Sequence, residues 1–289
     1  MKAIAESELI INNDGSIFHL HLKPEQIADT VFLVGDPARV TTISDMFDTI
    51  EHKVQNREFV THTGIYKGKR FSALATGIGT DNIDIVINEL DALVNVDLKT
   101  RKSKSDHKSL NLIRLGTSGG LQEDLDIDSF LMTETSIGFD GLLNFYKNRD
   151  AVCKLEVEKE FLKHMNWNPK LASPYFIDGS KELLEKLGQG IRKGITISAP
   201  GFYGPQARVI RLEIQDPEIN DKIRSFNYEN KKITNYEMES SALFGLSALL
   251  GHKAATICVI IANRYAGKYS KDYKPAVKKL IETVLNRLV

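Results

Sequence analysis

The segment Ile113–Leu121, IRLGTSGGL, places the charged side chain of Arg114 inside an apolar run. An unpaired charge is costly to bury, and arginine is rarely buried without a partner. Thr117, Ser118 and the glycines after them add hydroxyls and backbone that can approach a ligand closely. Because a planar guanidinium matches the oxygens of phosphate, we interpret Arg114 as part of an anion site. The alternative is an arginine paired to a structural carboxylate.

The turn Val34–Val40, VGDPARV, combines Gly35, Pro37 and Arg39 at the end of an apolar run. Glycine lets the backbone approach a ligand, and proline suits the first turn of a helix. The free N–H groups of a helix start attract anions, and Arg39 would add a second fork of donors. On this turn alone, an ordinary strand-to-helix turn with a surface arginine is the favoured interpretation.

Two acids flank one methionine in NYEMESSALFG, where Glu237, Met238 and Glu239 come directly before an apolar helical segment. Buried carboxylates are costly unless they are paired. Glu239 could accept two hydrogen bonds from the vicinal hydroxyls of a sugar. Equally, both acids could cap the N-terminus of the helix, where the dipole favours negative charge. The residues alone weigh the two interpretations about evenly.

The segment Gly201–Arg208, GFYGPQAR, joins aromatic, amide and guanidinium side chains in one loop. Phe202 could stack on a planar ring. Gln206 both donates and accepts hydrogen bonds, whereas Arg208 only donates them. Together they could recognise an imide edge such as that of uracil. A surface loop with one core aromatic residue is the competing interpretation.

Other patterns that carry chemistry are incomplete in this sequence. The segment Gly77–Asn82, GIGTDN, resembles a dinucleotide fingerprint, but Asn82 stands where the third glycine belongs. The seven histidines have no metal-binding spacing, so we expect no metal centre, and no G-x-S-x-G nucleophile motif occurs. Cys258 lies in an apolar run that predicts a buried thiol, and Cys153 is distant from it in the chain.

Short apolar runs that alternate with amphipathic segments must position these residues. Continuous apolar strands between helices indicate an α/β sheet covered on both faces, with ligands at the carboxyl ends of strands. The predicted strands are 30–35, 70–77, 111–117, 129–135, 194–200 and 254–263. The predicted helices begin near 81, 239 and 274, and Thr80 or Asp81 is expected to cap the first of them.

Composition sets the limits on partners and compartment. The 289 residues carry 38 basic and 38 acidic side chains, so no overall charge attracts nucleic acid or a membrane surface. The polar stretch Asp97–Lys108 predicts a solvated surface insertion. We find no signal-peptide pattern and no apolar stretch of about 20 residues, and therefore expect a cytoplasmic protein.

Taken in order, six motifs carry a resemblance to a known family. They are VGDPARV, REFVTHTG, ATGIG, IRLGTSGGL, GFYGPQAR and NYEMES, and the resemblance runs from Phe18 to Arg264. The chain resembles the nucleoside phosphorylase family, and within it the uridine phosphorylases. The resemblance implies an α/β fold, a single domain over residues 1–289 whose twisted mixed β-sheet is partly closed into a barrel and flanked by helices. It also implies a homo-oligomer, either a dimer or a hexamer of stacked dimers.

The resemblance assigns roles to residues by motif. It implies a phosphate site of Gly35, Arg39, Arg57, Arg114 and Thr117. It implies ribose contacts from His19, Met238 and Glu239, and base contacts from Phe202, Gln206, Arg208 and Arg264. Arg208, Gln206 and Arg114 are the implied catalytic residues. His19 and Arg57 resemble residues that a neighbouring subunit lends to the site.

The implied reaction is uridine plus phosphate giving ribose 1-phosphate plus uracil. The purine branch of the family carries an aspartate where this chain reads Ile261-Ala262-Asn263-Arg264, and its absence favours a pyrimidine. The alternatives are a purine nucleoside phosphorylase or nucleosidase of the same family, and a nucleoside-binding protein without catalysis. No cofactor is expected, since phosphate is a co-substrate. A monovalent cation near Glu58 and Ile78 occurs in some relatives, but Asn82 stands here at the position of a serine ligand, which argues against it.

Overall fold

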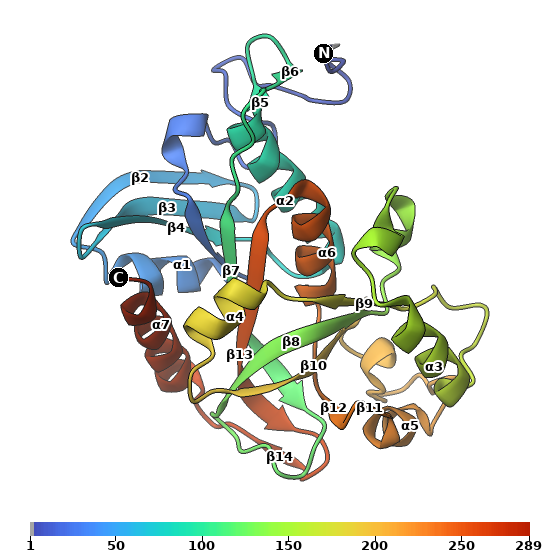
Figure 1. Cartoon of the computed structure of the whole chain (residues 1–289). Helices are drawn as coiled ribbons and strands as arrows, with labels where there is room; N and C mark the ends of the chain where they lie inside the picture. The colour runs from blue at the N-terminus through green and yellow to red at the C-terminus, as the bar shows by residue number, and fades with distance from the viewer. Residues whose placement is uncertain (1–2) are drawn as a thin grey trace.

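The computed structural model describes residues 3–289, and twelve of the strands in these residues join in one large mixed sheet (Figure 1). The order along the sheet is β11 (Asn227–Tyr228), β12 (Lys231–Glu237), β10 (Arg192–Ser198), β8 (Phe130–Gly138), β13 (Lys253–Asn263), β7 (Asn111–Gly120), β1 (Thr30–Val34), β4 (Lys69–Ala75), β3 (Phe59–Tyr66) and β2 (Thr49–Asn56). The short strands β9 (Tyr175–Asp178) and β14 (Lys268–Tyr269) pair with β8 and β13.

One additional pairing closes part of the sheet into a barrel. Strand β12 pairs antiparallel with the end of β7, with Asn235 opposite Gly120 and Tyr236 opposite Gly119. Strands β7, β13, β8, β10 and β12 thereby form a closed ring of five. The predicted fold class, a mixed α/β sheet partly closed into a barrel, is confirmed. That residues 1–289 form a single domain remains a prediction.

A glycine in β10 lets two barrel strands pack closely. A Cβ atom on Gly194 would lie 2.2 Å from Oγ1 of Thr234 in β12, a separation that atoms cannot adopt. The parallel register of β10 with β12 shifts just after this point, between Ile195 and Thr196. The absent side chain therefore allows β12 to reach the position from which it pairs with β7.

Helices cover both sides of the sheet, as Figure 1 shows. They are α1 (Pro37–Ser44), α2 (Thr80–Asn95), α3 (Leu155–Met165), α4 (Lys181–Leu187), α5 (Ile219–Ser225), α6 (Ser240–Leu250) and α7 (Lys274–Leu288). Helices α2 and α6 bury their apolar residues in one core cluster, whereas α1, α4 and α7 contribute to a second. The third cluster joins α3 and α5 to the barrel.

The six predicted strands and three predicted helices are present, with two corrections. Strand β7 continues to Gly120, because its pairing with β13 and β12 extends past the predicted end at Thr117. The predicted cap of α2 is wrong: Gly79, at φ +100°, is the N-cap, and no side chain caps this helix. A left-handed φ of this kind suits glycine, and neither Thr80 nor Asp81 occupies the position.

The predicted insertion lies at the surface beside the N-terminal segment (Figure 1). It forms a small hairpin of β5 (Val96–Asp97) and β6 (Lys102–Ser103), and most of its residues are exposed. The N–H of Ile4 donates to the carbonyl of Arg101. Over residues 3–289, none of the helices combines the length and the apolar character needed to cross a membrane.

Candidate active site

Arg114 is the centre of the site, and it is buried with only 5% of its surface exposed. Its Nη2 donates to the carboxylate of Glu239, and its Nε lies 3.4 Å from Oε2 of Glu237. Among residues 3–289, Nε and Nη1 have no hydrogen-bond partner. The guanidinium is therefore paired for charge but retains buried donors, which is the state expected of an arginine that binds an anion.

The two acids at the start of α6 have different roles. Glu237, at the end of β12, accepts hydrogen bonds from the backbone N–H groups of Glu239 and Ser240 and from Oγ of Ser198. Glu239 instead turns towards Arg114 and accepts the N–H of Gly79 at 2.9 Å. The capping interpretation thus holds for Glu237, and Glu239 is presented to the site.

Burial sets the charge behaviour of this cluster. Burial, opposed by Arg114 and aided by the nearby charge of Glu237, raises the pKa of Glu239 to about 7. Burial works against the charge of Arg114, but Glu239 and Glu237 outweigh it and raise the pKa of Arg114. The cluster therefore holds a permanent cation beside a carboxylate that titrates near neutrality.

Arg39 points towards the same place from α1. It is the third residue of the helix, and its Nη1 donates to the carbonyl of Leu115 in β7 at 3.0 Å. Burial, and after it the neighbouring charge of Arg114, lowers its pKa. Arg39 is thus half-buried and tied to β7, and its role in binding phosphate stays a prediction.

The backbone around Arg39 is also close-packed. A Cβ on Gly35 would lie 3.3 Å from the carbonyl oxygen of Gly77, so two glycine turns meet here. The N-cap Asp36 accepts the N–H of Ala38, so its carboxylate occupies part of the helix start. Thr117, the remaining predicted phosphate contact, is half-buried in β7 opposite Val259.

A second cluster forms around Gln206, which is 3% exposed. Nη1 of Arg208 donates to Oε1 of Gln206 and to the carbonyl of Phe202, and the Arg208 guanidinium lies 3.8 Å from the centroid of the Phe202 ring. Arg264 donates to the backbone carbonyls of Gln206 and Ala207. Ala207 adopts φ +54°, a conformation that is costly for a residue with a Cβ. The hydrogen bonds from Arg264 help to hold the turn in this conformation.

The two clusters meet at the end of β7. A Cβ on Gly119 would lie 3.8 Å from Nη2 of Arg208 and 3.8 Å from Cδ of Arg264. Gly119 is five residues beyond Arg114 on the same strand. The strand thus carries the predicted phosphate-binding residue Arg114 at one point and borders the predicted base-recognition residues at another.

His19 and Arg57 form a separate group. His19 Nδ1 lies 2.6 Å from Oε1 of Glu89 in α2, and the amide of Asn56 donates to the His19 carbonyl. Arg57, at φ +53° in the turn between β2 and β3, lies over the Phe18 ring at 5.9 Å. No hydrogen bond or ion pair within the described chain joins His19 or Arg57 to Arg114.

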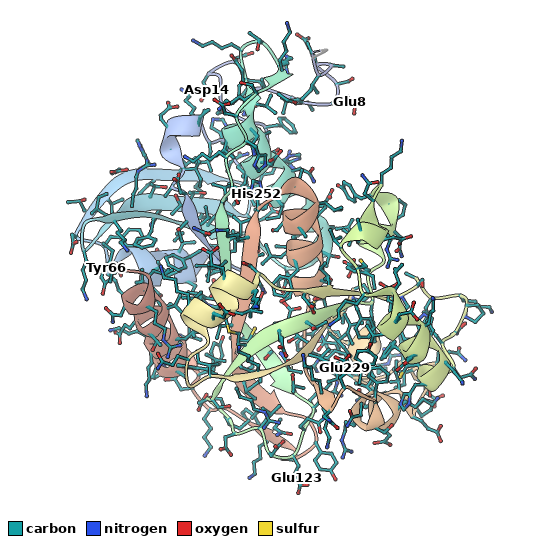
Figure 2. The ribbon with its side chains drawn as sticks, viewed as in Figure 1. Glu8, Asp14, Tyr66, Glu123, Glu229 and His252 are labelled. Atoms are coloured by element: carbon teal, nitrogen blue, oxygen red, sulfur yellow. The ribbon has the colours of Figure 1, made fainter. Side chains whose placement is uncertain are left out.

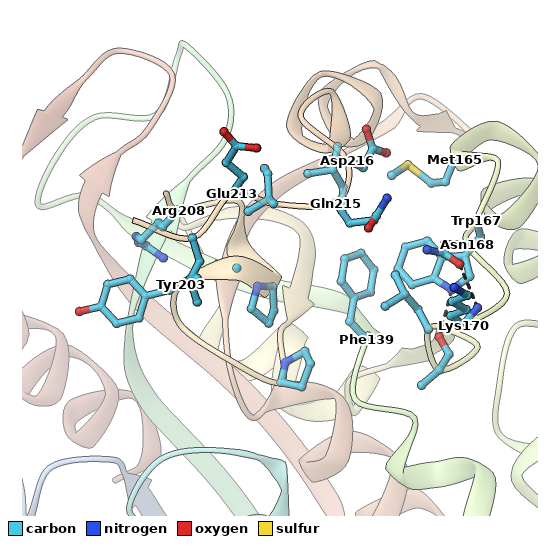
Figure 3. A pocket seen from close by; sticks show the side chains of 18 of the residues that line it. Phe139, Met165, Trp167, Asn168, Lys170, Tyr203, Arg208, Glu213, Gln215 and Asp216 are labelled. Carbon is cyan, nitrogen blue, oxygen red and sulfur yellow. Dashed lines mark hydrogen bonds between the residues drawn. The ribbon is translucent and has the colours of Figure 1, made fainter. Parts of the chain in front are cut away.

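A cavity of about 820 Å³ adjoins the second cluster (Figure 3). Tyr203 and Arg208 lie at one end of it, and Phe139, Met165 and Trp167 line the other. Of the site residues predicted from the sequence, Arg208 is the one that borders it among residues 3–289. The cavity therefore extends from the predicted base end and not from the phosphate end.

Two places bear on cation binding. The side chains of Glu58 and Asn82 both lie near Gly77, and Ile78 beside it is exposed; that no monovalent cation binds here stays a prediction. Asp91, His107 and His252 come within 4.8 Å of one another, a cluster that the histidine spacing did not predict. The buried His252 (Figure 2) accepts the N–H of Leu110 at Nδ1, so its proton resides on Nε2, facing Asp91, and blocks that nitrogen as a metal ligand.

Glu237 is the site residue that the sequence did not assign. Its carboxylate ends an apolar strand, and a second polar residue, Ser198, ends the neighbouring strand β10. In the sequence, the feature that could have indicated Glu237 is a polar side chain at the end of each of two apolar runs. The sequence does not show that these two strands are adjacent, so their contact could not be inferred.

Comparison with known proteins identifies the family. Residues 29–288 match the model of the Phosphorylase superfamily, and the chain belongs to this superfamily. A uridine phosphorylase from Thermococcus kodakarensis is 29% identical over 266 residues, which cover 89% of this chain and 81% of the relative. A DeoD-type purine nucleoside phosphorylase from Clostridium perfringens is 27% identical over 276 residues, covering 94% of this chain and 98% of the relative.

Solved structures give the same result. The Trypanosoma brucei nucleoside phosphorylase, described as showing uridine phosphorylase activity, matches with a TM-score of 0.83 at 27% identity. The match covers 97% of this chain and 99% of the other. The resemblance inferred from the six motifs is thereby confirmed.

Because Arg114 keeps unpartnered donors, inorganic phosphate should stabilise the protein against heat. At a concentration about 100 times the dissociation constant, binding adds about 2.7 kcal/mol. Arg114→Lys keeps the positive charge but loses the planar guanidinium with its several N–H donors. This variant should lose most of the phosphate-induced shift in melting temperature. Potassium chloride at equal ionic strength is the control. An unchanged phosphate shift in Arg114→Lys would rule out this arginine as the grip.

Proposed function

We propose that this chain catalyses the phosphorolysis of uridine to ribose 1-phosphate and uracil. The observation that carries the proposal is the buried Arg114, which has free donors beside Glu239 and lies on the strand that borders Gln206 and Arg208. The residues proposed to bind phosphate, the ribose hydroxyls and the base thus lie on or beside one barrel strand, which supports the proposal. The named activities of the Thermococcus and Trypanosoma relatives support the choice of uridine.

In the proposed reaction, phosphate binds to Arg39 and Arg114 with Gly35 and Thr117. Glycosidic cleavage develops positive charge on the sugar ring. A phosphate held on one face of the ring offsets that charge and then bonds to the anomeric carbon as the bond to the base breaks. Burial strengthens this attraction, and the fixed arginines supply orientation.

Ribose binding falls to Met238 and Glu239. The carboxylate of Glu239 can accept hydrogen bonds from both ribose hydroxyls when it is ionised. The N–H groups of Gly79 and Met238 already donate to this carboxylate and fix its direction. Sugar binding therefore requires the ionised form of a group whose pKa is about 7.

The base leaves as an anion stabilised by Arg208 and Gln206. Arg208 contributes a positive charge at the developing negative oxygens of uracil, so no strong general acid is required. Phe202 contributes an aromatic face next to this pair, and Arg264 supports the base end through the carbonyls of Gln206 and Ala207.

The proposal includes an oligomer, a dimer or a hexamer, with His19 and Arg57 lent to the site of a neighbouring subunit. Within residues 3–289 no hydrogen bond or ion pair joins them to Arg114, as expected of residues that act in the site of another subunit. We also propose a cytoplasmic setting, which suits the two unpaired cysteines, Cys153 and Cys258.

Two alternatives are kept. Similarity to a purine nucleoside phosphorylase allows a purine nucleoside as the substrate. A nucleosidase would release the base without phosphate, and a nucleoside-binding protein would release none. The unpartnered donors of Arg114 favour a phosphate-dependent enzyme over either.

The test of the proposal is base release from a panel of nucleosides, each assayed with and without phosphate. We expect uridine to be cleaved with phosphate present and to persist without it. Faster cleavage of inosine or adenosine would transfer the assignment to the purine branch. Phosphate-independent cleavage would make the protein a hydrolase.

Arg208→Ala should lower kcat for uridine by about 10²–10³, because one preorganised donor to the developing anion is lost. Phosphate binding, measured by calorimetry, should stay close to wild type, since Arg208 belongs to the other cluster. Undiminished uridine turnover would refute the assignment of the base site.

Arg57→Ala should be inactive alone but recover when mixed and reassembled with Arg208→Ala. In a two-fold dimer with a shared site, random mixing restores about a quarter of wild-type activity. The matched control is Arg39→Ala mixed with Arg208→Ala, where both residues belong to one subunit and no rescue is expected. Confirmed subunit exchange without recovery of activity would count against the lent arginine.

A further inference from the structure

Glu237 is a buried carboxylate that caps the start of α6, and the proposed reaction gives it no part. It is 4% exposed at the end of β12, immediately before the residues proposed to bind ribose. A buried acid is costly unless its oxygens are satisfied, and here both are. The question is what the chain gains by keeping a second negative charge beside Glu239.

We propose that Glu237 is a positioning residue of the active site, which holds both Glu239 and Arg114 in the orientation that binds the substrates. This inference rests on the proposed function. The polar contacts of Glu237 come from three places: the start of α6, the end of β10 and Arg114 in β7.

The first contacts fix the turn that carries Glu239. Oε2 of Glu237 accepts the N–H of Glu239 at 3.1 Å, and both Glu237 oxygens accept the N–H of Ser240 at 3.0 Å. These are the first N–H groups of helix α6, which a carboxylate satisfies well. Because the Glu239 backbone is tied down two residues from Glu237, its side chain is directed to Arg114 and Gly79.

A second contact fixes Glu237 itself. Oγ of Ser198, at the end of β10, donates to Oε1 of Glu237. The same hydroxyl accepts the N–H of Ser241 at 2.9 Å. One serine therefore joins the end of β10, the end of β12 and the first turn of α6.

The third contact governs the arginine. Oε2 of Glu237 lies 3.4 Å from Nε of Arg114, while Glu239 takes Nη2. Held from two sides, the planar guanidinium has one rotational setting, and Nη1 is left without a partner among residues 3–289. Phosphate bound at Nη1 would leave this contact in place, so Glu237 still opposes the charge of Arg114 from the Nε side.

The charge of Glu237 also acts on Glu239. The groups that face Glu239 are Arg114 from β7, Glu237 from β12, the Cys258 thiol from β13 and the backbone N–H groups of Gly79 and Met238. A neighbouring negative charge favours the protonated form of a carboxylic acid. Removing the charge at 237 should therefore lower the pKa of Glu239 from its value of about 7.

The variant Glu237→Gln tests this directly, because an amide keeps an acceptor and a donor but has no charge. Without substrates, the carboxyl ¹³C resonance of Glu239, assigned with Glu239→Gln, should titrate about one pH unit lower than in the wild type. Since Glu239 must be ionised to bind ribose, the acid limb of kcat/KM for uridine should move down by the same amount. The titration of phosphate itself is the same for wild type and Glu237→Gln, so a difference between their pH profiles comes from the protein.

The orienting role predicts a second loss. Phosphate affinity should fall by about 10- to 100-fold in Glu237→Gln, the usual effect of removing a residue that orients a binding group. Glu237→Asp keeps the charge but has a shorter reach. It should keep the Glu239 titration near the wild-type pH and lose phosphate affinity, so it separates charge from geometry even if Glu237→Gln folds poorly.

Glu158→Gln is the matched control. Glu158 is a buried acid of α3 that accepts from Nη2 of Arg149 and from the N–H of Phe176, outside the site. It should change neither the Glu239 titration nor phosphate affinity. If Glu237→Gln leaves both unchanged as well, the inference is overturned. Failure of the wild type to cleave uridine would overturn the proposed function instead, because the resonance is followed without substrates.

Discussion

The site depends on one buried guanidinium held between two carboxylates. Arg114 could not remain inside an apolar strand unless charges opposed it, and Glu237 and Glu239 supply them. One carboxylate would be enough to neutralise the buried Arg114 guanidinium, and two are present. Arg39 adds a second positive charge next to Arg114. Such an arrangement can bind phosphate, because among residues 3–289 Nε and Nη1 of Arg114 have no hydrogen-bond partner.

The pairing of the strands brings these charged groups together. Closure of the barrel through the pairing of β12 with β7 brings Glu237 and Glu239 to the strand that carries Arg114. The same strand ends at Gly119, where a side chain would meet Arg208 and Arg264. Strand β7 therefore sets the distance between the predicted phosphate region at Arg114 and the predicted base region at Gly119. The strained turn at Ala207, supported by Arg264, then presents Gln206 and Arg208.

Much of this could be predicted from the sequence, because apolar runs and their ends report strands directly. Arg114 stood out on physical grounds, as a charge within such a run. Barrel closure came from the family resemblance and not from the pattern, since which strands are neighbours depends on long-range contacts. The turn alone could not show that Arg39 reaches β7, because its contact with Leu115 joins residues 76 positions apart. The cap of α2 was misassigned because a left-handed glycine, and not a side chain, begins that helix. The separate roles of Glu237 and Glu239 depend on side-chain directions that adjacent positions in the sequence cannot show.

The central claim is that Arg114 grips the phosphate. A crystal structure of the protein with bound phosphate tests it most directly. The account predicts phosphate oxygens within hydrogen-bond distance of Nη1 of Arg114 and of the Arg39 guanidinium, with Nε still facing Glu237. A phosphate bound elsewhere, with Arg114 unchanged between its two carboxylates, would contradict the account.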